Sequence, residues 1–182
     1  MKRIFSIFIC ISMLVMCISG LNLIAFAALE GEGTEANPYI ITTPDEFINN
    51  LKGDRTGTYF VIQNDIVLDS TYVPRAFKGN LKGAVKPDGS KYKITVNITS
   101  TSQNIGTFDT FGGGTIENLE LAGNISFSGT LPLRIGGVAG RIDSAATIKD
   151  CITSITITGT EAAADAAVGG VVGYARDTTI IN

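Results

Sequence analysis

One short phrase that occurs three times constrains the fold of this chain more than any other feature. The phrases TIENLELAG, TIKDCITSI and TIIN begin at Thr115, Thr147 and Thr179, a spacing of 32 residues each time. An apolar, glycine-containing segment precedes the later copies and reads IGGVAG (135–140) and then VGGVVG (168–173). Self-similarity at such a period indicates an architecture of stacked repeats. Each unit is expected to hold short strands joined by tight turns.

A single unit could not fold alone. Ordering about 30 residues costs roughly 30–60 kcal/mol of backbone entropy. A unit carries about seven large apolar side chains, each worth about 1.5–3 kcal/mol when buried. Neighbouring units must therefore stack and share one core, with their strands about 4.8 Å apart. This predicts that Ile116, Ile148 and Ile180 lie one above the other in the interior.

Six repeat glycines are predicted to be structural, because glycine permits positive φ and close approach of stacked backbones. They are Gly136, Gly137, Gly140, Gly169, Gly170 and Gly173. A phosphate-binding loop is the competing interpretation. It is disfavoured because GGVAG lacks the Gly-x-Gly-x-x-Gly spacing and no helix follows.

Polar residues recur at one place in the repeat, two residues after each repeat isoleucine: Asn118, Asp150 and Asn182. They are expected to stack as a ladder in a turn, since Asn and Asp tolerate the left-handed conformation. A calcium site is the less favoured reading, because each unit offers a single oxygen ligand and no Asp-x-Asp-x-Asp-Gly pattern is present. Cys151 takes the place of Leu119, which predicts a buried small hydrophobe rather than a reactive thiol.

The first 27 residues have the layout of a secretory signal peptide. Lys2 and Arg3 precede an apolar run over 4–24, and Ala25-Phe26-Ala27 fits the small-x-small cleavage rule. Ala28 is then the mature N-terminus, and the product is secreted or on the cell surface. An uncleaved anchor is the alternative, since the run is close to the about 20 residues that a span needs. Lipidation of Cys17 is disfavoured by the large residue before it.

Composition narrows the function. The chain has 14 basic and 17 acidic residues, and two basic residues leave with the signal peptide. The acidic balance argues against nucleic-acid and anionic-membrane partners. Histidine is absent, which removes the commonest general base and metal ligand. Cys151 would be the one cysteine left after cleavage, so no internal disulfide is expected.

Between the signal peptide and the repeats, residues 28–58 are expected to form an N-terminal segment with a capping helix. TPDEFINNL has Thr43 as N-cap, Pro44 at the first helical position and Glu46 completing a capping box. Tyr39-Ile40-Ile41 reads as a short strand, and β-type sequence begins at Tyr59. FKGNLKG (77–83) is interpreted as a turn-rich link and EAAADAA (161–167) as a loop.

The phrases GGVAG…TIKDC…ITG and VGGVVG…TIIN resemble the GLUG repeat of bacterial surface and secreted proteins. GEGTEANPYIITTPDEFINNL resembles the segment that often precedes such repeats. FKGNLKGAVKPDGSKYKITV is a weaker match, because Lys82 stands where the family prefers Asp and a longer loop follows. The resemblance implies an all-β, right-handed parallel β-helix over 59–182, with repeats at about 105–134, 135–167 and 168–182. The last repeat is incomplete, and no catalytic residues are known for the repeat itself.

The expected function is therefore that of a non-catalytic extracellular segment with an adhesive or spacer role. Its ligand is unidentified (a glycan, a wall polymer or a host protein), and no cofactor or metal is expected. One alternative is the non-catalytic front of a larger secreted enzyme, such as an immunoglobulin-A-specific metallopeptidase. A less favoured one is a polysaccharide lyase, whose base would come from Arg134, Arg141 or Arg176, all expected in turns. Because no polar cap follows the last repeat, the chain is also expected to be a fragment of a longer protein or an early-terminated product.

Overall fold

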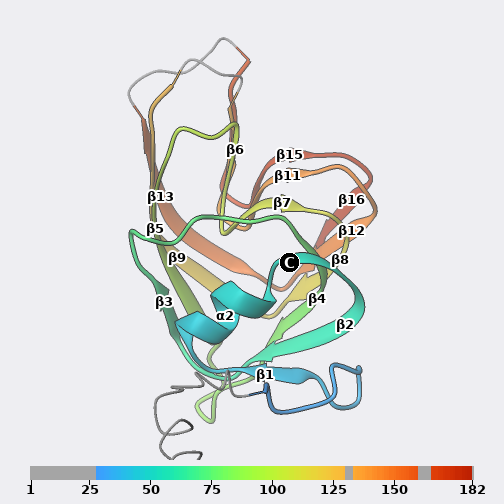
Figure 1. The fold of residues 1–182 in the computed structure, drawn as a ribbon. Coiled ribbons are helices and arrows are strands. Elements are labelled where there is room, and N and C mark those ends of the chain that lie inside the picture. Colours follow the sequence, from blue (N-terminus) through green and yellow to red (C-terminus); the bar gives the residue numbers. More distant parts are fainter. Residues whose placement is uncertain (1–27, 130–132, 160–164, 182) are drawn as a thin grey trace, which may run out of the picture.

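Parallel β-strands make up most of the molecule, and one short helix lies near its N-terminal side (Figure 1). The computed structural model describes residues 28–129, 133–159 and 165–181. The elements are β1 (Tyr39–Ile41), α2 (Pro44–Asn50), β2 (Gly53–Ile62), β3 (Ile66–Leu68), β4 (Phe77–Gly83), β5 (Lys93–Ser100), β6 (Asn104–Ile105), β7 (Phe108–Phe111), β8 (Gly114–Glu117), β9 (Glu120–Phe127), β10 (Arg134–Gly136), β11 (Ala139–Ile142), β12 (Ala146–Lys149), β13 (Ile152–Gly159), β14 (Ala167–Gly169), β15 (Val172–Ala175) and β16 (Thr178–Ile181).

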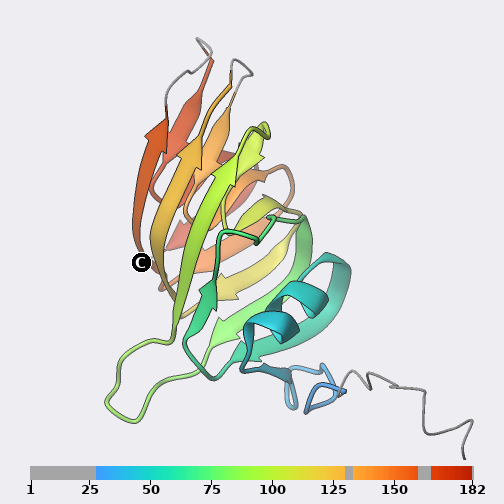
Figure 2. The same ribbon diagram turned by 60° about the vertical axis from the view of Figure 1, so that its left-hand side comes forward.

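The described strands form sheets of nine, four and three strands, which wrap around one core in a nearly closed, barrel-like arrangement (Figure 1). From β5 onward, each strand pairs with the strand four places later. The resulting ladders are β5–β9–β13, β6–β10–β14, β7–β11–β15 and β8–β12–β16, with β3 added to the first and β4 joining the last two. All pairs between the named strands are parallel. Figure 2 shows strands of the β5–β9–β13 ladder side by side and running in the same direction.

The repeat spacing sets the register of one ladder. Ile116 on β8 pairs with Ile148 on β12, which pairs in turn with Ile180 on β16. Ile116 and Ile148 are each 1% exposed, whereas Ile180 is 51% exposed. The alignment is as predicted, but the predicted burial is wrong for Ile180. Its strand is the last of the ladder, and none of the described strands covers its outer side.

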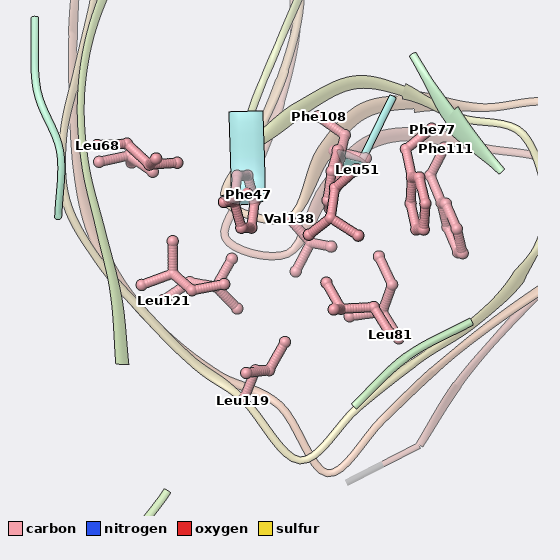
Figure 3. Packing of buried hydrophobic residues seen from close by; sticks show 14 of the residues in the cluster. Phe47, Leu51, Leu68, Phe77, Leu81, Phe108, Phe111, Leu119, Leu121 and Val138 are labelled. Atoms are coloured by element: carbon pink, nitrogen blue, oxygen red, sulfur yellow. The ribbon is translucent and has the colours of Figure 1, made fainter. Parts of the chain in front are cut away.

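Large aromatic and aliphatic side chains from every side of the barrel fill its interior (Figure 3). The Phe77 ring stacks against Phe108 at a centroid distance of 5.0 Å and against Phe111 at 6.0 Å. Phe47 of helix α2 stacks on Phe108 at 5.8 Å. The helix lies over the end of the stack that the earliest strands, β1–β3, form (Figures 1 and 2). The helix residue Phe47 and the C-cap residue Leu51, both buried, therefore close that end of the core.

The helix start is confirmed in detail. Thr43 is the N-cap, its hydroxyl accepts from the Glu46 N–H at 3.2 Å, and the Glu46 carboxylate accepts from the Thr43 N–H at 3.1 Å. The same carboxylate accepts from the Thr42 N–H at 2.7 Å. Desolvation raises the pKa of Glu46, but the hydrogen bonds from Thr42 and Thr43 outweigh it and hold this pKa below its ordinary value.

Two sequence predictions about strands need correction. The β-region begins at Gly53 rather than Tyr59. The segment 77–83, predicted as a turn-rich link, is the strand β4 in the middle of the largest sheet, paired with β2, β7 and β8. Its glycines reflect crowding rather than turning, because a Cβ on Gly83 would lie 2.1 Å from the Asn118 carbonyl oxygen. Most of the predicted loop 161–167 lies outside the described residues, and β14 begins at Ala167.

Candidate functional site

The repeat glycines lie at the corner between two consecutive strands of one unit, where the backbones of the two strands are in close contact. Strand β10 leads through Gly137 and Val138 into β11, and β14 leads through Gly170 and Val171 into β15. A Cβ on Gly136 would lie 2.4 Å from the Ala139 carbonyl oxygen, and one on Gly173 would lie 2.4 Å from the Ile135 nitrogen. Real Cβ atoms do not approach backbone so closely. These glycines are therefore required by backbone contact.

The other repeat glycines follow the same pattern with one exception. A Cβ on Gly137, Gly140 or Gly169 would lie 2.6, 2.4 or 2.1 Å from a backbone atom. Gly170 has room, since its nearest neighbour would be the Thr153 hydroxyl at 3.7 Å. None of the six repeat glycines has a positive φ of the kind that favours glycine. Of the two predicted reasons, positive φ is therefore wrong and close approach is the physical cause.

A threonine replaces glycine in the first unit, and the repeat pattern gave no signal for its role. Thr107 is fully buried, and its hydroxyl donates to the Gly137 carbonyl at 2.8 Å. The Thr107 carbonyl accepts in turn from the Tyr72 hydroxyl at 2.6 Å. The Thr107 hydroxyl thus has a hydrogen-bond partner in the next unit. This bond makes a polar side chain acceptable at a buried position.

The polar repeat residues lie at a turn between strands. Asn118 and Asp150 have φ values of 55° and 51°, in the left-handed region that Asn and Asp tolerate. The Asn118 N–H donates to the Lys149 carbonyl at 3.1 Å, and the Asp150 N–H donates to the Ile181 carbonyl at 2.9 Å. Each turn is therefore bonded to the following unit through its backbone. Asn182, the third member, lies outside the described residues.

Both ends of the Asn118 side-chain amide bond to protein groups. Its amide donates to the Gly83 carbonyl at 2.7 Å, and its amide oxygen accepts from the Lys91 ammonium. Among the described residues, no group of three or more His, Cys, Asp or Glu side chains is placed to share a metal ion. The contacts of Asn118 are those of a structural turn.

Cys151 follows the polar turn and aligns with Leu119. Leu119 is fully buried, whereas Cys151 is partly buried and packs against the core. The Cys151 thiol lies 3.3 Å from the Lys149 carbonyl oxygen. Burial raises the pKa of this thiol.

The last strands of the ladders present an apolar face. Strands β13–β16 each have one edge that is unpaired among the described strands. Five large hydrophobic side chains on these strands are between 38% and 55% exposed: Ile152, Val168, Tyr174, Ile180 and Ile181. We call this surface the terminal face. It exposes both apolar side chains and free backbone hydrogen-bonding groups, the combination that accepts another strand.

The arginines considered for lyase chemistry lie elsewhere than predicted. Arg134 is on β10 and Arg141 is on β11, rather than in turns. Both guanidinium groups lie over the Tyr174 ring, at 5.0 and 5.8 Å from its centroid. Arg141 also pairs with Asp143. Arg176 does follow a strand in a turn and donates to the Asp143 carbonyl at 3.3 Å.

A groove of about 290 Å³ lies on the outer surface of the barrel. We call it the lateral groove. Residues of β2, β4 and β8 form its floor, and the 35–38 segment stands beside it. Two of the floor residues, Phe60 and Leu81, have their side chains buried in the core, and the others are on the outer face of the strands. The lining residues are Glu35, Pro38, Tyr59, Phe60, Val61, Asn80, Leu81, Lys82, Thr115 and Glu117. Sequence reasoning missed this groove because its members come from four separate segments and share no motif.

No family model, curated protein or solved structure matches the chain. In the part of the chain that the structure describes, no helix is long and apolar enough to cross a membrane.

Proposed function

We propose that this chain is a non-catalytic, extracellular segment of a bacterial surface or secreted protein, folded as a right-handed parallel β-helix and related to GLUG repeats. Its role is that of a structural or adhesive spacer. The observation that carries the proposal is the pairing of each strand with the strand four places later. A chain that closed simply into a barrel would pair consecutive strands instead. Pairing at a constant offset is what successive turns of a solenoid produce.

The packing supports a spacer built by addition of similar units. Ile116 and Ile148 occupy equivalent places and are equally buried, and Gly136 and Gly169 are directly paired. Each unit therefore offers the next one nearly the same surface. A fold of this kind can lengthen without redesign of its core.

Lengthening the repeat region tests the fold. Four further copies of residues 135–167 would be inserted after Ala167, with a scrambled insert of the same length as the control. A β-helix gains about 4.8 Å per turn, or roughly 19 Å in all, measurable as an increased maximum dimension in small-angle X-ray scattering. A folded product with unchanged length, or unfolding to the same degree as the scrambled control, would contradict the β-helix.

The proposed extracellular localisation is tested separately. Expression in a bacterium followed by fractionation should place the product outside the cytoplasm, and mass spectrometry should find Ala28 at its N-terminus. Support for export comes from the sequence of residues 1–27. An intact chain that retains Met1 and stays in the cytoplasm would refute this part of the proposal.

A further inference from the structure

We propose that the lateral groove binds a neutral saccharide. The groove combines the tyrosine Tyr59, the apolar residues Pro38 and Val61, and a pair of charged side chains in one concave surface. Its volume of about 290 Å³ is near the lower limit of ligand pockets, which hold about 300–1,000 Å³. That is room for a sugar ring rather than for a protein segment.

The groove offers the two kinds of contact that a pyranose requires. Tyr59 is half-buried and lines the groove beside Pro38 and Val61, so it provides an apolar surface for the C–H face of a sugar. Glu117 and Lys82 lie at the same groove, with Oε1 and Nζ 3.2 Å apart. A carboxylate accepts and an ammonium donates, so the pair can bond adjacent hydroxyl groups of one ring.

The charge of the groove selects against other small ligands. Lys82 compensates Glu117, and Glu35 adds one further carboxylate. Anionic ligands such as phosphates are therefore disfavoured, since they call for a net positive site. Purely apolar ligands would displace water from the charged pair without replacing its hydrogen bonds. A neutral, hydroxyl-rich ligand with an apolar face fits both conditions.

The groove is also formed before any ligand arrives. The N-terminal wall is held by backbone bonds from the Tyr59 N–H to the Gly33 carbonyl and from the Ile40 N–H to the Glu30 carbonyl, both 2.9 Å long. On the floor, the Asn80 amide oxygen accepts from the Thr115 N–H at 3.2 Å. A rigid wall and floor reduce the ordering cost of binding.

Tyrosine fluorescence gives a direct assay, since the chain has five tyrosines and no tryptophan. The full chain, purified after expression, is titrated with cellotriose, chitotriose, mannotriose and maltotriose. At least one should change the emission, with a saturable curve below about 10 mM. Saturation-transfer NMR with the same trisaccharides provides an independent readout.

Variants locate the binding site. Glu117→Gln combined with Glu35→Gln should weaken binding at least about tenfold. Tyr59→Ser should abolish binding, whereas Tyr59→Phe keeps the ring and should retain it. Glu120→Gln is the matched control, because Glu120 pairs with Lys93 at 2.9 Å outside the groove. Circular dichroism melts of all variants separate loss of binding from loss of fold.

Two results would overturn the proposal: no trisaccharide binds, or binding is unaffected by the groove variants. The proposal deepens the adhesive role proposed above, but its test does not depend on it. Binding is measured on purified protein, whereas export is measured by fractionation. Failure of one is therefore distinguishable from failure of the other.

Discussion

Truncation of Ile148 to alanine should destabilise the protein far more than the same truncation of Ile180. The two side chains occupy neighbouring places in one ladder and have the same chemistry. They differ in cover, because Ile148 lies between Ile116 and Ile180 and is 1% exposed, while Ile180 is 51% exposed. The pair therefore isolates the contribution of being covered by a further unit.

The expected magnitudes follow from that difference. Buried Ile→Ala substitutions cost about 2–5 kcal/mol, because the transfer term is joined by a cavity that the surroundings fill poorly. We expect about 3–4 kcal/mol for Ile148→Ala. At Ile180 about half of the roughly 1.5–3 kcal/mol burial term is present, and no enclosed cavity forms, so about 1 kcal/mol is expected. Ile116→Ala should resemble Ile148→Ala.

Urea unfolding at constant temperature provides the measurement, followed by far-UV circular dichroism and by tyrosine emission. Coincident transitions from the two probes justify a single free energy of unfolding for each variant. Equal costs for Ile148 and Ile180, within about 0.5 kcal/mol, would refute the argument that each unit is buried by the next.

Three further predictions test separate features. Gly136→Ala should cost about 1–3 kcal/mol in urea unfolding, since its Cβ would meet backbone; Gly170→Ala, whose Cβ would lie 3.7 Å from Thr153, should cost much less, and equal losses would contradict the packing argument. The lowered pKa of Glu46 predicts that its contribution to stability is fully present above the unfolded value of 4.5 and is lost as pH falls through the folded value. Glu46→Gln should reduce this pH dependence in thermal melts, and an unchanged slope would count against it. The raised pKa of Cys151 predicts slow alkylation by iodoacetamide near neutral pH in the folded protein and fast alkylation in urea, measured by mass spectrometry; equal rates would show an accessible thiolate.

Sequence reasoning succeeded where one local pattern has one physical outcome. The capping box needs only Thr43, Pro44 and Glu46, which are close together in the chain, and it is present as predicted. The 32-residue spacing likewise predicts which isoleucines pair, because strands that stack must keep a constant phase.

It failed where the decisive contacts join distant segments. The glycines of Phe77–Gly83 resemble turn residues, but they are needed because β4 passes between crowded strands, including a contact with Asn118. On the outer surface, Asn97 and Asn124 hydrogen-bond side chain to side chain at 3.3 Å; the two strands share only a short Asn-Ile-Thr/Ser phrase, which the repeat analysis did not use. The lateral groove depends on the N-terminal segment folding back over β2 and β4. The periodicity of the repeats does not predict where the N-terminal segment packs.

The helix α2 covers the N-terminal end of the core, and this position suggests an order in which the units assemble. Phe47 and Leu51 seal that end with side chains from the earliest described part of the chain, ahead of almost every strand. A chain that leaves a ribosome or a translocation pore N-terminus first would deliver this helix before its repeats, and the plug would be complete once Phe108 of β7 packs on Phe47. Each later unit would then find a finished template waiting, so assembly can proceed in step with delivery and only the newest edge is bare at any moment.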